Sequence, residues 1–345
     1  LTNSKFQVLS ALFFGLNLFT YHSARLLTLP VVFYLIFLFR RQILKSKHFL
    51  ISGSVLLAFL AVAVITLFQG AGVRASTSTI FNPTDGWGGV SDSRYKEFLS
   101  GTPDIIARVF NNKFIYPSTL FVDNYLSYFS KQFFFTQGPA EYTYGMVPGM
   151  GLLYLFEIFF LAAFVWRYCR KGYKDSHFLL FWFFVSPIAA SITKGPGYAA
   201  NRVAFMMPSV QIMLAIGVLY LLNFVKKYIQ IRKIAFLSFT IFTVSLLFFL
   251  HGYLVSQKIY GVRGMVYGAR EIFKDLDDSS YREIIVSKKL SEPQIYLAFY
   301  KKIDPVLVQT ASVDWKFEDE GKAWVDQLGN YSLGKYTFKN IDYKN

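Results

Sequence analysis

Long apolar runs separated by short basic connections constrain the fold of this chain more than any other feature of its sequence. A helix of about 20 apolar residues is needed to cross a hydrocarbon core about 30 Å thick. Hydrophobic residues make up 54% of the 345 residues, as expected for a chain with several such helices. The sequence therefore predicts a polytopic α-helical membrane protein with about seven transmembrane helices. The seven apolar runs are residues 6–20, 24–39, 49–68, 148–166, 178–193, 203–222 and 234–253.

Charged residues indicate how these runs are oriented. Residues 254–345 hold 14 of the 36 Lys and Arg residues and 13 of the 21 Asp and Glu residues, so this part is nearly neutral. Nearly all of the net charge of +15 therefore lies in the apolar part of the chain, which argues against a nucleic-acid partner. Cytoplasmic loops of membrane proteins carry an excess of Lys and Arg. Three basic connections between the runs fall on the same face if the runs alternate in direction, so this face is predicted to be cytoplasmic. These connections contain Arg40, Arg41, Lys45 and Lys47, then Arg167, Arg170, Lys171 and Lys174, then Lys226, Lys227, Arg232 and Lys233.

Composition also divides the chain into four predicted parts. The long segment between the third and fourth runs is expected on the external side, with irregular structure from Gly70 to Gly101. Apolar residues at helical spacing predict two short interfacial helices within it, near 105–110 and 121–129. The four parts are transmembrane helices one to three (1–68), the external loop (69–147), transmembrane helices four to seven (148–253) and a C-terminal domain (254–345).

The composition after Tyr253 is that of a soluble domain, predicted to be a small extracytoplasmic α/β domain. It contains no GxGxxG or P-loop sequence, so the sequence assigns it no nucleotide. The predicted elements are helices at 267–276 and 293–300 and strands at 283–287, 306–310 and 336–341.

Glu157 is the only acidic residue in the seven runs. If a helix starts at Pro148, Glu157 lies about 14 Å into the membrane, since each residue advances a helix by about 1.5 Å. Tyr154 and Met150 would then share its face. A carboxylate at this depth is expected to face other helices or a wet cavity. Two interpretations follow, a polar site close to a lipid-linked substrate or a protonated or paired group that holds two helices together.

Other polar candidates lie at the predicted external ends of the runs. A membrane enzyme that acts on a lipid phosphate needs guanidinium or ammonium groups to bind the phosphate and a carboxylate to accept a proton. Ordinary contacts with lipid headgroups are the alternative role for each basic residue. The candidates for substrate or phosphate binding are His22, Arg25, Lys194, Tyr198 and Arg202, and those for an acceptor site or cavity are Asp123, Glu141 and Glu157.

Signatures of soluble enzymes are absent from the sequence. Four scattered histidines and one cysteine, Cys169, form no zinc-binding pattern, and no Gly-x-Ser-x-Gly sequence occurs. The sequence therefore assigns no cofactor and no metal ligands, and it leaves a role for a divalent metal ion open.

Several short strings resemble polytopic bacterial glycosyltransferases of the GT-C type, relatives of protein O-mannosyltransferases and of the lipid A aminoarabinose transferase. The resemblance extends over almost the whole chain, in the order of its apolar runs as well as in these strings. They are GLNLFTYHSARLLTLP (15–30), FVDNYLSYFS (121–130), VPGMGLLYLFEI (147–158), GPGYAANRVAFMMP (195–208) and IYLAFYKKIDPVLVQ (295–309).

This resemblance implies an inverting transfer of a hexosyl or pentosyl group from a polyprenyl-phosphate donor, on the outer face of the plasma membrane. It implies a lipid-linked sugar and membrane lipids as partners. In that family the catalytic Asp or Glu lies in the first external loop, and nothing here matches it, so we expect it upstream of Leu1. Relatives also often show Gly-Asp and then Arg-His before the PGxGxLY string, where this chain has Gly138-Pro139 and Tyr144-Gly145.

Two other classes of function remain open. A transporter or flippase of lipid-linked saccharides would show internal repeats and helices broken near the middle of the membrane. Pro187 lies within the fifth run, but no repeat is seen. A non-catalytic membrane assembly protein is the third interpretation, because the chain lacks a recognisable catalytic base. The long external loop and the soluble C-terminal domain favour the enzyme.

Overall fold

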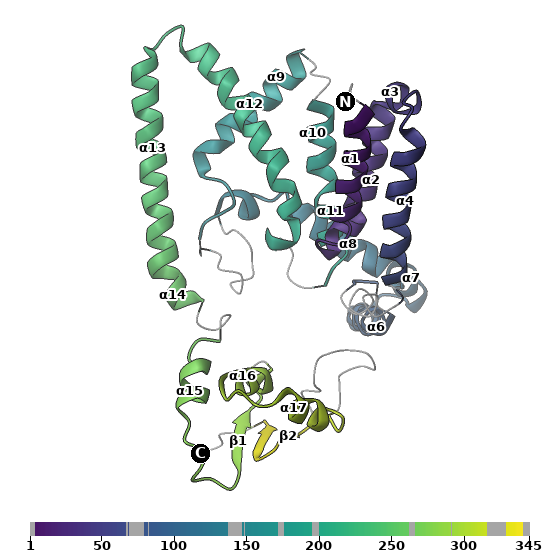
Figure 1. Cartoon of the computed structure of the whole chain (residues 1–345), viewed down its shortest axis with the longest axis vertical. Helices are drawn as coiled ribbons and strands as arrows, with labels where there is room; N and C mark the ends of the chain where they lie inside the picture. Colours follow the sequence, from purple (N-terminus) through teal and green to yellow (C-terminus); the bar gives the residue numbers. More distant parts are fainter. Residues whose placement is uncertain are drawn as a thin grey trace. The chain divides into compact units, whose positions relative to one another are not determined.

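The computed structural model describes residues 4–66, 68, 79–81, 83–136, 147, 149–171, 176–194, 200–261, 266–290, 292–315 and 329–340. The chain divides into two compact units, Leu1–Gln257 and Lys258–Asn345, called here the N-terminal and C-terminal units. Helices dominate the N-terminal unit, whereas the C-terminal unit combines helices with a small sheet (Figure 1).

Three helical stretches of the N-terminal unit are long and apolar enough to cross a membrane. Their mean hydropathies are 2.5, 2.0 and 2.1, and they coincide with the predicted runs 49–68, 203–222 and 234–253. They are α4 (Phe49–Thr66), the stretch Asn201–Val225 formed by the 3-10 turn η5 (Ala200–Met206) and α12 (Met207–Val225), and the stretch Arg232–Ser256 formed by α13 (Ile231–His251) and the π turn η6 (Gly252–Ser256).

Shorter apolar helices occupy three further predicted runs. The helix over residues 22–38 is followed by the short basic helix α3 (Arg40–Leu44), and η6 is followed by α14 (Gln257–Tyr260). The shorter apolar helices are α1 (Ser4–Asn17), α2 (His22–Leu38), and the pair α10 (Ser176–Val185) and α11 (Pro187–Ser191).

The predicted helix over 148–166 is wrong at its start. Residues 149–154 are not helical, and the helix begins with the 3-10 turn η4 (Leu155–Glu157), which leads into α9 (Ile158–Lys171). Two backbone features explain the delay. Gly149 has φ +77°, and a Cβ atom on Gly151 would lie 2.2 Å from the carbonyl oxygen of Phe134. The N–H groups of Leu152 and Leu153 donate to carbonyl oxygens of the π turn η2 (Gln132–Thr136). They therefore do not take part in the hydrogen bonds of an α-helix.

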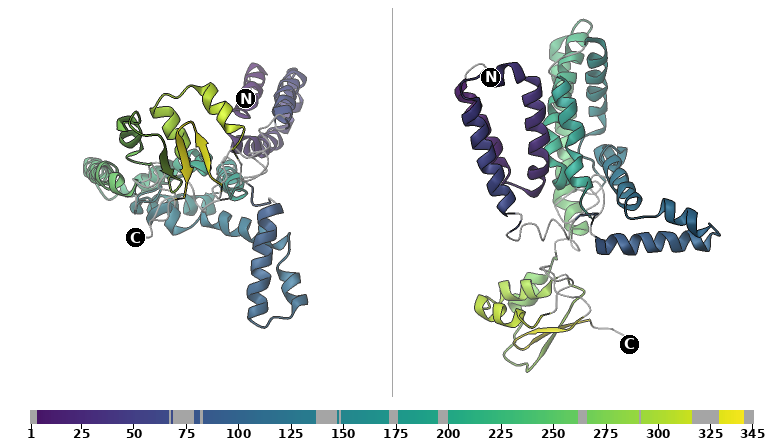
Figure 2. Two further views of the ribbon diagram at one scale, coloured as in Figure 1. Left: turned by 90° about the horizontal axis from the view of Figure 1, so that it is seen from below. Right: turned by 90° about the vertical axis from the view of Figure 1, so that its right-hand side faces the viewer.

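The segment between α4 and α9 contains α6 (Pro83–Leu99), α7 (Asp104–Phe110) and α8 (Ile115–Ser127), which extend to the side of the upright helices (Figure 2). The two predicted short helices are confirmed as α7 and α8, but the prediction of irregular structure over Gly70–Gly101 is wrong for α6. Contacts with later residues stabilise α6. Arg94 Nε donates to the carbonyl oxygen of Asn111 at 2.7 Å, and Gly89 leaves room for the ring of Tyr116.

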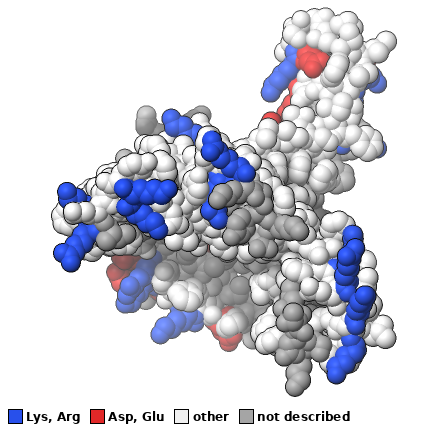
Figure 3. Space-filling view, turned by 90° about the horizontal axis from the view of Figure 1, so that it is seen from above, with Lys and Arg blue, Asp and Glu red and all other residues white. Residues whose placement is uncertain are grey.

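Elements rich in Lys and Arg gather at one end of the N-terminal unit, called here the basic end. Figure 1 places α3, the C-terminal end of α9 and the α12–α13 connection at this end. In the view onto it, Lys and Arg side chains clearly outnumber Asp and Glu (Figure 3). The opposite, distal end carries α6, α7, α8 and α11 (Figure 1). The three predicted basic connections therefore share one end of the bundle.

The core of the N-terminal unit lies where α8, η2, α9, α10 and α12 meet. Helices α9 and α12 cross in close contact, because a Cβ atom on Gly217 would lie 1.9 Å from the carbonyl oxygen of Phe160. Small residues allow such backbone contact between helices in membranes. The fully buried core side chains include Tyr128, Phe133, Phe164, Val203, Met206 and Val210.

The C-terminal unit is built on a three-stranded mixed sheet in the order β1-β3-β2. Strand β3 (Tyr336–Lys339) pairs in parallel with β1 (Ile284–Ser287) and antiparallel with β2 (Tyr331–Leu333). Gly334, with φ +59°, supplies the positive φ that the two-residue turn between β2 and β3 requires. Helices α15 (Ala269–Asp275), α16 (Pro293–Tyr300) and α17 (Pro305–Ser312) complete the unit.

Most predicted elements of this unit are present, but the predicted strand over 306–310 is wrong. These residues lie in α17, whose first turn is fixed by its cap. Asp304 Oδ1 accepts a hydrogen bond from the Val306 N–H at 2.9 Å, and Pro305 occupies the first helical position. The core contains Leu297 and Phe338, both fully buried, and the ring of Phe338 stacks on Tyr331 at 4.8 Å between centroids. The predicted small α/β domain is thus confirmed as a fold.

Candidate functional site

The short helix α11 is the common neighbour of the elements that carry most sequence-predicted site residues. The α10–α11 helix is interrupted at Ser186, because Pro187 has no N–H to continue the helical hydrogen bonds. The Ser186 hydroxyl donates to the Trp182 carbonyl oxygen at 2.6 Å instead of facing a ligand. Helices α2 and α8 and the turn η5 all pack against α11, which is largely buried.

Arg25 and Arg202 lie on two of these elements, α2 and η5, and among the described residues they form hydrogen bonds with different groups. Arg25 Nε donates to the Leu18 carbonyl oxygen at 3.2 Å, and its Nη1 is buried without a hydrogen-bond partner among the described residues. Arg202 Nη1 donates to Thr193 Oγ1 at 3.1 Å and to the Lys194 carbonyl oxygen. The structure thus packs α2 and η5 against the same helix, α11, while the two guanidinium groups bond different described residues.

The residues that follow α11 are bound to the start of the long segment between α4 and α9. The Ile80 N–H donates to the Ile192 carbonyl oxygen at 2.9 Å, and Thr79 pairs with Thr193 in an antiparallel bridge. Sequence reasoning missed Thr79 and Thr193, because nothing in either local pattern indicates this distant pairing. Arg202 therefore contacts a segment that is itself fixed by two backbone interactions.

Asn124, the neighbour of the predicted Asp123, is the residue of α8 that bonds to α11. Its Nδ2 donates to the Ser191 carbonyl oxygen at 3.3 Å. Asp123 is exposed and forms no hydrogen bond with a described residue. The one-residue difference follows from helix geometry, since adjacent residues on a helix point about 100° apart.

Glu157 lies in the first turn of the α9 helix, so its predicted position in the middle of a helix is wrong. Its Oε2 accepts a hydrogen bond from the Tyr154 N–H at 2.8 Å, one of the donors that a helix start leaves unpaired. Because residues 149–154 are not helical, the predicted face shared with Tyr154 and Met150 is wrong as well. The carboxylate is therefore a cap for the helix start.

Three remaining predictions fall outside the described residues. Tyr198 and Glu141 lie in ranges that the structure does not describe, as do positions 138–145 where the sequence departs from the family pattern. The backbone of His22 begins α2, but its side chain is not described. Among the described residues, no group of three or more His, Cys, Asp and Glu is placed to hold a metal ion.

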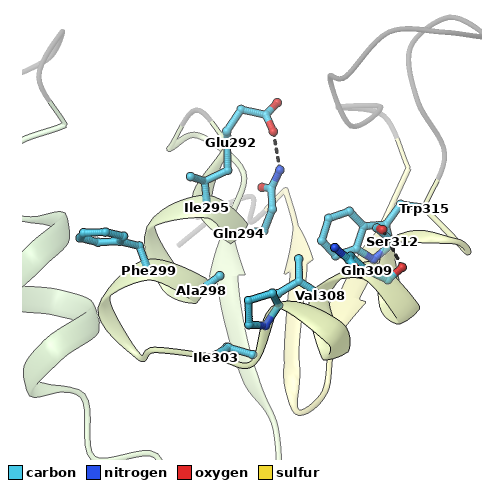
Figure 4. A pocket seen from close by; sticks show the side chains of 11 residues that line it. Glu292, Gln294, Ile295, Ala298, Phe299, Ile303, Val308, Gln309, Ser312 and Trp315 are labelled. Atoms are coloured by element: carbon cyan, nitrogen blue, oxygen red, sulfur yellow. Dashed lines mark hydrogen bonds between the residues drawn. The ribbon is translucent and has the colours of Figure 1, made fainter.

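The C-terminal unit has a cavity of about 750 Å³ between α16 and α17. Figure 4 shows apolar side chains from both helices around it, with Trp315 on one side and Glu292 and Gln294 on another. Gln294 is buried and accepts a hydrogen bond from the Tyr331 hydroxyl at 2.7 Å, while its amide donates to Glu292. The cavity lining is mainly apolar and includes the polar residues Glu292, Gln294, Gln309 and Ser312.

Comparisons with protein-family models, curated proteins and solved structures found nothing that matches this chain.

Proposed function

We propose that the chain is part of a GT-C type membrane glycosyltransferase that transfers a sugar from a polyprenyl-phosphate donor to an acceptor on the outer face of the plasma membrane. In this proposal the basic end is cytoplasmic, the distal end and the C-terminal unit are extracytoplasmic, and all seven apolar runs lie in the membrane. The described apolar helices and the GT-C-like strings quoted above support it.

The observation that carries the proposal is the packing of α2, α8 and η5 around α11 at the distal end. Arg25 and Arg202 lie on α2 and η5, which share α11 as a neighbour with the side helix α8. A lipid phosphate at the membrane surface would need guanidinium donors at that end. Arg25 Nη1 is a buried donor without a partner among the described residues, and a phosphate oxygen would satisfy it.

Donor binding tests this proposal directly, because it needs no catalytic base. We expect the purified chain in nanodiscs to bind a polyprenyl-phosphate sugar, and Arg25→Gln to weaken that binding by roughly tenfold or more. Arg108→Gln is the matched control, since Arg108 is exposed on α7 and pairs with Asp104 at 2.8 Å. Equal losses in the two variants, or no binding by the parent chain, would contradict the proposal.

A transporter of lipid-linked saccharides is the second candidate, favoured by the interrupted helix α10–α11. Transporter sites often use helices broken within the membrane, and this helix breaks at Ser186. Reconstituted vesicles separate the two candidates. A transporter moves a labelled lipid-linked sugar between leaflets without an acceptor, whereas this part of a transferase binds the donor without moving it.

A further inference from the structure

A second cavity, of about 270 Å³, lies at the basic end of the N-terminal unit. It is formed by the C-terminal part of α9, the start of α10 and the C-terminal part of α12. The function proposed above does not use it, because that function places its phosphate group at the distal end. The residues that line the cavity are Arg167, Ser176, Ile216, Leu219, Tyr220 and Asn223.

Ser176 is the unusual residue of this cavity. It is 4% exposed, and its hydroxyl forms no hydrogen bond with any described residue. Because Ser176 lines the cavity, its hydroxyl is available to a ligand group that can form a hydrogen bond with it. Ser176 is also the first residue of the ten-residue helix α10, where unpaired N–H groups and the helix dipole favour an anion.

The other polar groups of the cavity suit the same kind of ligand. The Arg167 guanidinium lies over the Tyr220 ring, 5.8 Å from its centroid, and Asn223 adds an amide. Helices α9, α10 and α12 contain no Asp or Glu, and in the sequence Lys174 offsets Asp175 just before α10. Lys226 and Lys227 directly follow α12, so the surroundings are net positive.

The apolar part of the lining indicates that the anion is attached to a lipid. Ile216 and Leu219 line the cavity beside its polar groups, and Leu219 is 61% exposed on the side of α12. A soluble phosphate compound would leave this apolar surface uncovered, whereas an acyl chain would cover it. Basic pockets between membrane helices at the cytoplasmic side are suited to anionic headgroups.

We propose that this cavity binds the headgroup phosphate of an anionic phospholipid of the cytoplasmic leaflet. The phosphate accepts hydrogen bonds from Arg167, Ser176 and Asn223, and the acyl chains lie along Ile216 and Leu219. The proposal rests on the membrane location included in the proposed function, but not on sugar transfer.

Native mass spectrometry of the purified full chain in detergent tests this site, with phosphatidylglycerol compared with phosphatidylcholine. We expect preferential retention of phosphatidylglycerol and a loss of roughly tenfold in its affinity in Arg167→Gln. Arg170→Gln is the matched control, because Arg170 is exposed over the Trp166 ring at 4.4 Å and does not line the cavity. Equal retention of the two lipids, or an equal loss in the two variants, would overturn the proposal.

Ser176→Ala separates ligand binding from folding. Because its hydroxyl has no bond to lose among the described residues, the melting temperature without lipid should not fall, while the thermal shift caused by phosphatidylglycerol should shrink. A lower melting temperature without lipid and an unchanged shift would overturn the role of Ser176. Stabilisation by glycerol phosphate but not by phosphatidylglycerol would identify a soluble phosphate ester and overturn the lipid assignment. Donor binding at the distal end is measured separately with the polyprenyl-phosphate sugar, so the two proposals fail independently.

Discussion

Glu157 stabilises the start of the α9 helix through a hydrogen bond from the Tyr154 N–H at 2.8 Å. The sequence showed an isolated acid in an apolar run, which is a signal of either function or pairing. It did not show that Gly149 and Gly151 delay the helix until Leu155, and this delay changes the position of the carboxylate. The residue was identifiable from sequence, but its role depended on a backbone contact with Phe134.

Substitutions at position 157 distinguish the cap from a charge-dependent site. Glu157→Gln keeps an oxygen that accepts from Tyr154, so we expect little change in thermal stability in detergent. Glu157→Ala loses the acceptor and should cost about 1 kcal/mol, as for other helix caps. If the glutamine variant loses as much stability or donor binding as the alanine variant, the negative charge itself is required.

Asp278 connects the sheet of the C-terminal unit to two lysines. Its carboxylate accepts a hydrogen bond from the Tyr336 hydroxyl, and Lys301 and Lys335 each lie 3.7 Å away. The Tyr336 bond, and then the two lysines, hold the pKa of Asp278 below its ordinary value of 3.8. Burial and this same carboxylate raise the pKa of Tyr336, which therefore stays protonated and remains the donor at neutral pH.

Acid should therefore weaken the C-terminal unit. The unfolded chain takes up a proton at Asp278 more readily than the folded unit, so the stabilisation is complete above the unfolded pKa of about 3.9. It is lost as the pH falls through the lower folded value. We expect the amide-exchange protection factors of β3 to fall only below about pH 4, and Asp278→Asn to reduce that dependence. An identical acid response in the variant would exclude Asp278 as its source.

At the scale of elements, the contact between α9 and α12 depends on the missing side chain at position 217. A methyl group there would overlap the Phe160 carbonyl oxygen and push the helices apart. We expect Gly217→Ala to lower the stability of the chain in detergent by about 1–3 kcal/mol, measured by unfolding in a denaturing detergent. Gly53→Ala on α4 is the control, because nothing lies within 4 Å of the added methyl group. A loss of stability in both variants would point to helix flexibility instead of this contact.

Other elements show which sequence signals were sufficient. Long apolar runs predicted α4, α12 and α13, because burial in lipid requires a length and a composition that few other sequences have. Strand propensity failed for α17, where Val306 and Val308 favour a strand but the Asp304-Pro305 start fixes a helix. The helix α6 was missed because its stability depends on contacts with Asn111 and Tyr116, which a local reading does not include.

For the molecule as a whole, the native Cys169 is a reporter of orientation. It is the single cysteine of the chain and is exposed on α9, near the basic end. A membrane-impermeant thiol reagent should not label it in intact cells, but should do so after permeabilisation. Lys96→Cys on α6, in a Cys169→Ser background, should show the reverse accessibility, with labelling in intact cells. Labelling of Cys169 from outside would overturn the proposed orientation and the assignment of the distal end as the site of sugar transfer.

The candidate site around α11 was partly predictable at the scale of the whole molecule. Alternation of apolar runs with basic loops indicated that Arg25 and Arg202 lie at one end of the bundle, since each follows from counting helix directions. The sequence could not show that α11 is the shared neighbour, because a five-residue helix that begins at a proline has no distinctive pattern. The bridge between Thr79 and Thr193 was equally hidden, since it depends on the packing of the whole unit.

The parallel pairing of β1 with β3 has a consequence for biosynthesis. The central strand of the sheet, β3, is the last described strand in chain order, and residues 288–335 separate it from β1. At roughly 5–20 residues per second, a ribosome needs roughly 2 to 10 s to pass from one to the other. During that interval β1 has no neighbour on the side that β3 later occupies, and the hydrophobic cluster that contains Leu297 lacks Phe338. A nascent chain that stops before Tyr336 would therefore expose an unpaired strand edge, a substrate that quality-control proteases and chaperones recognise.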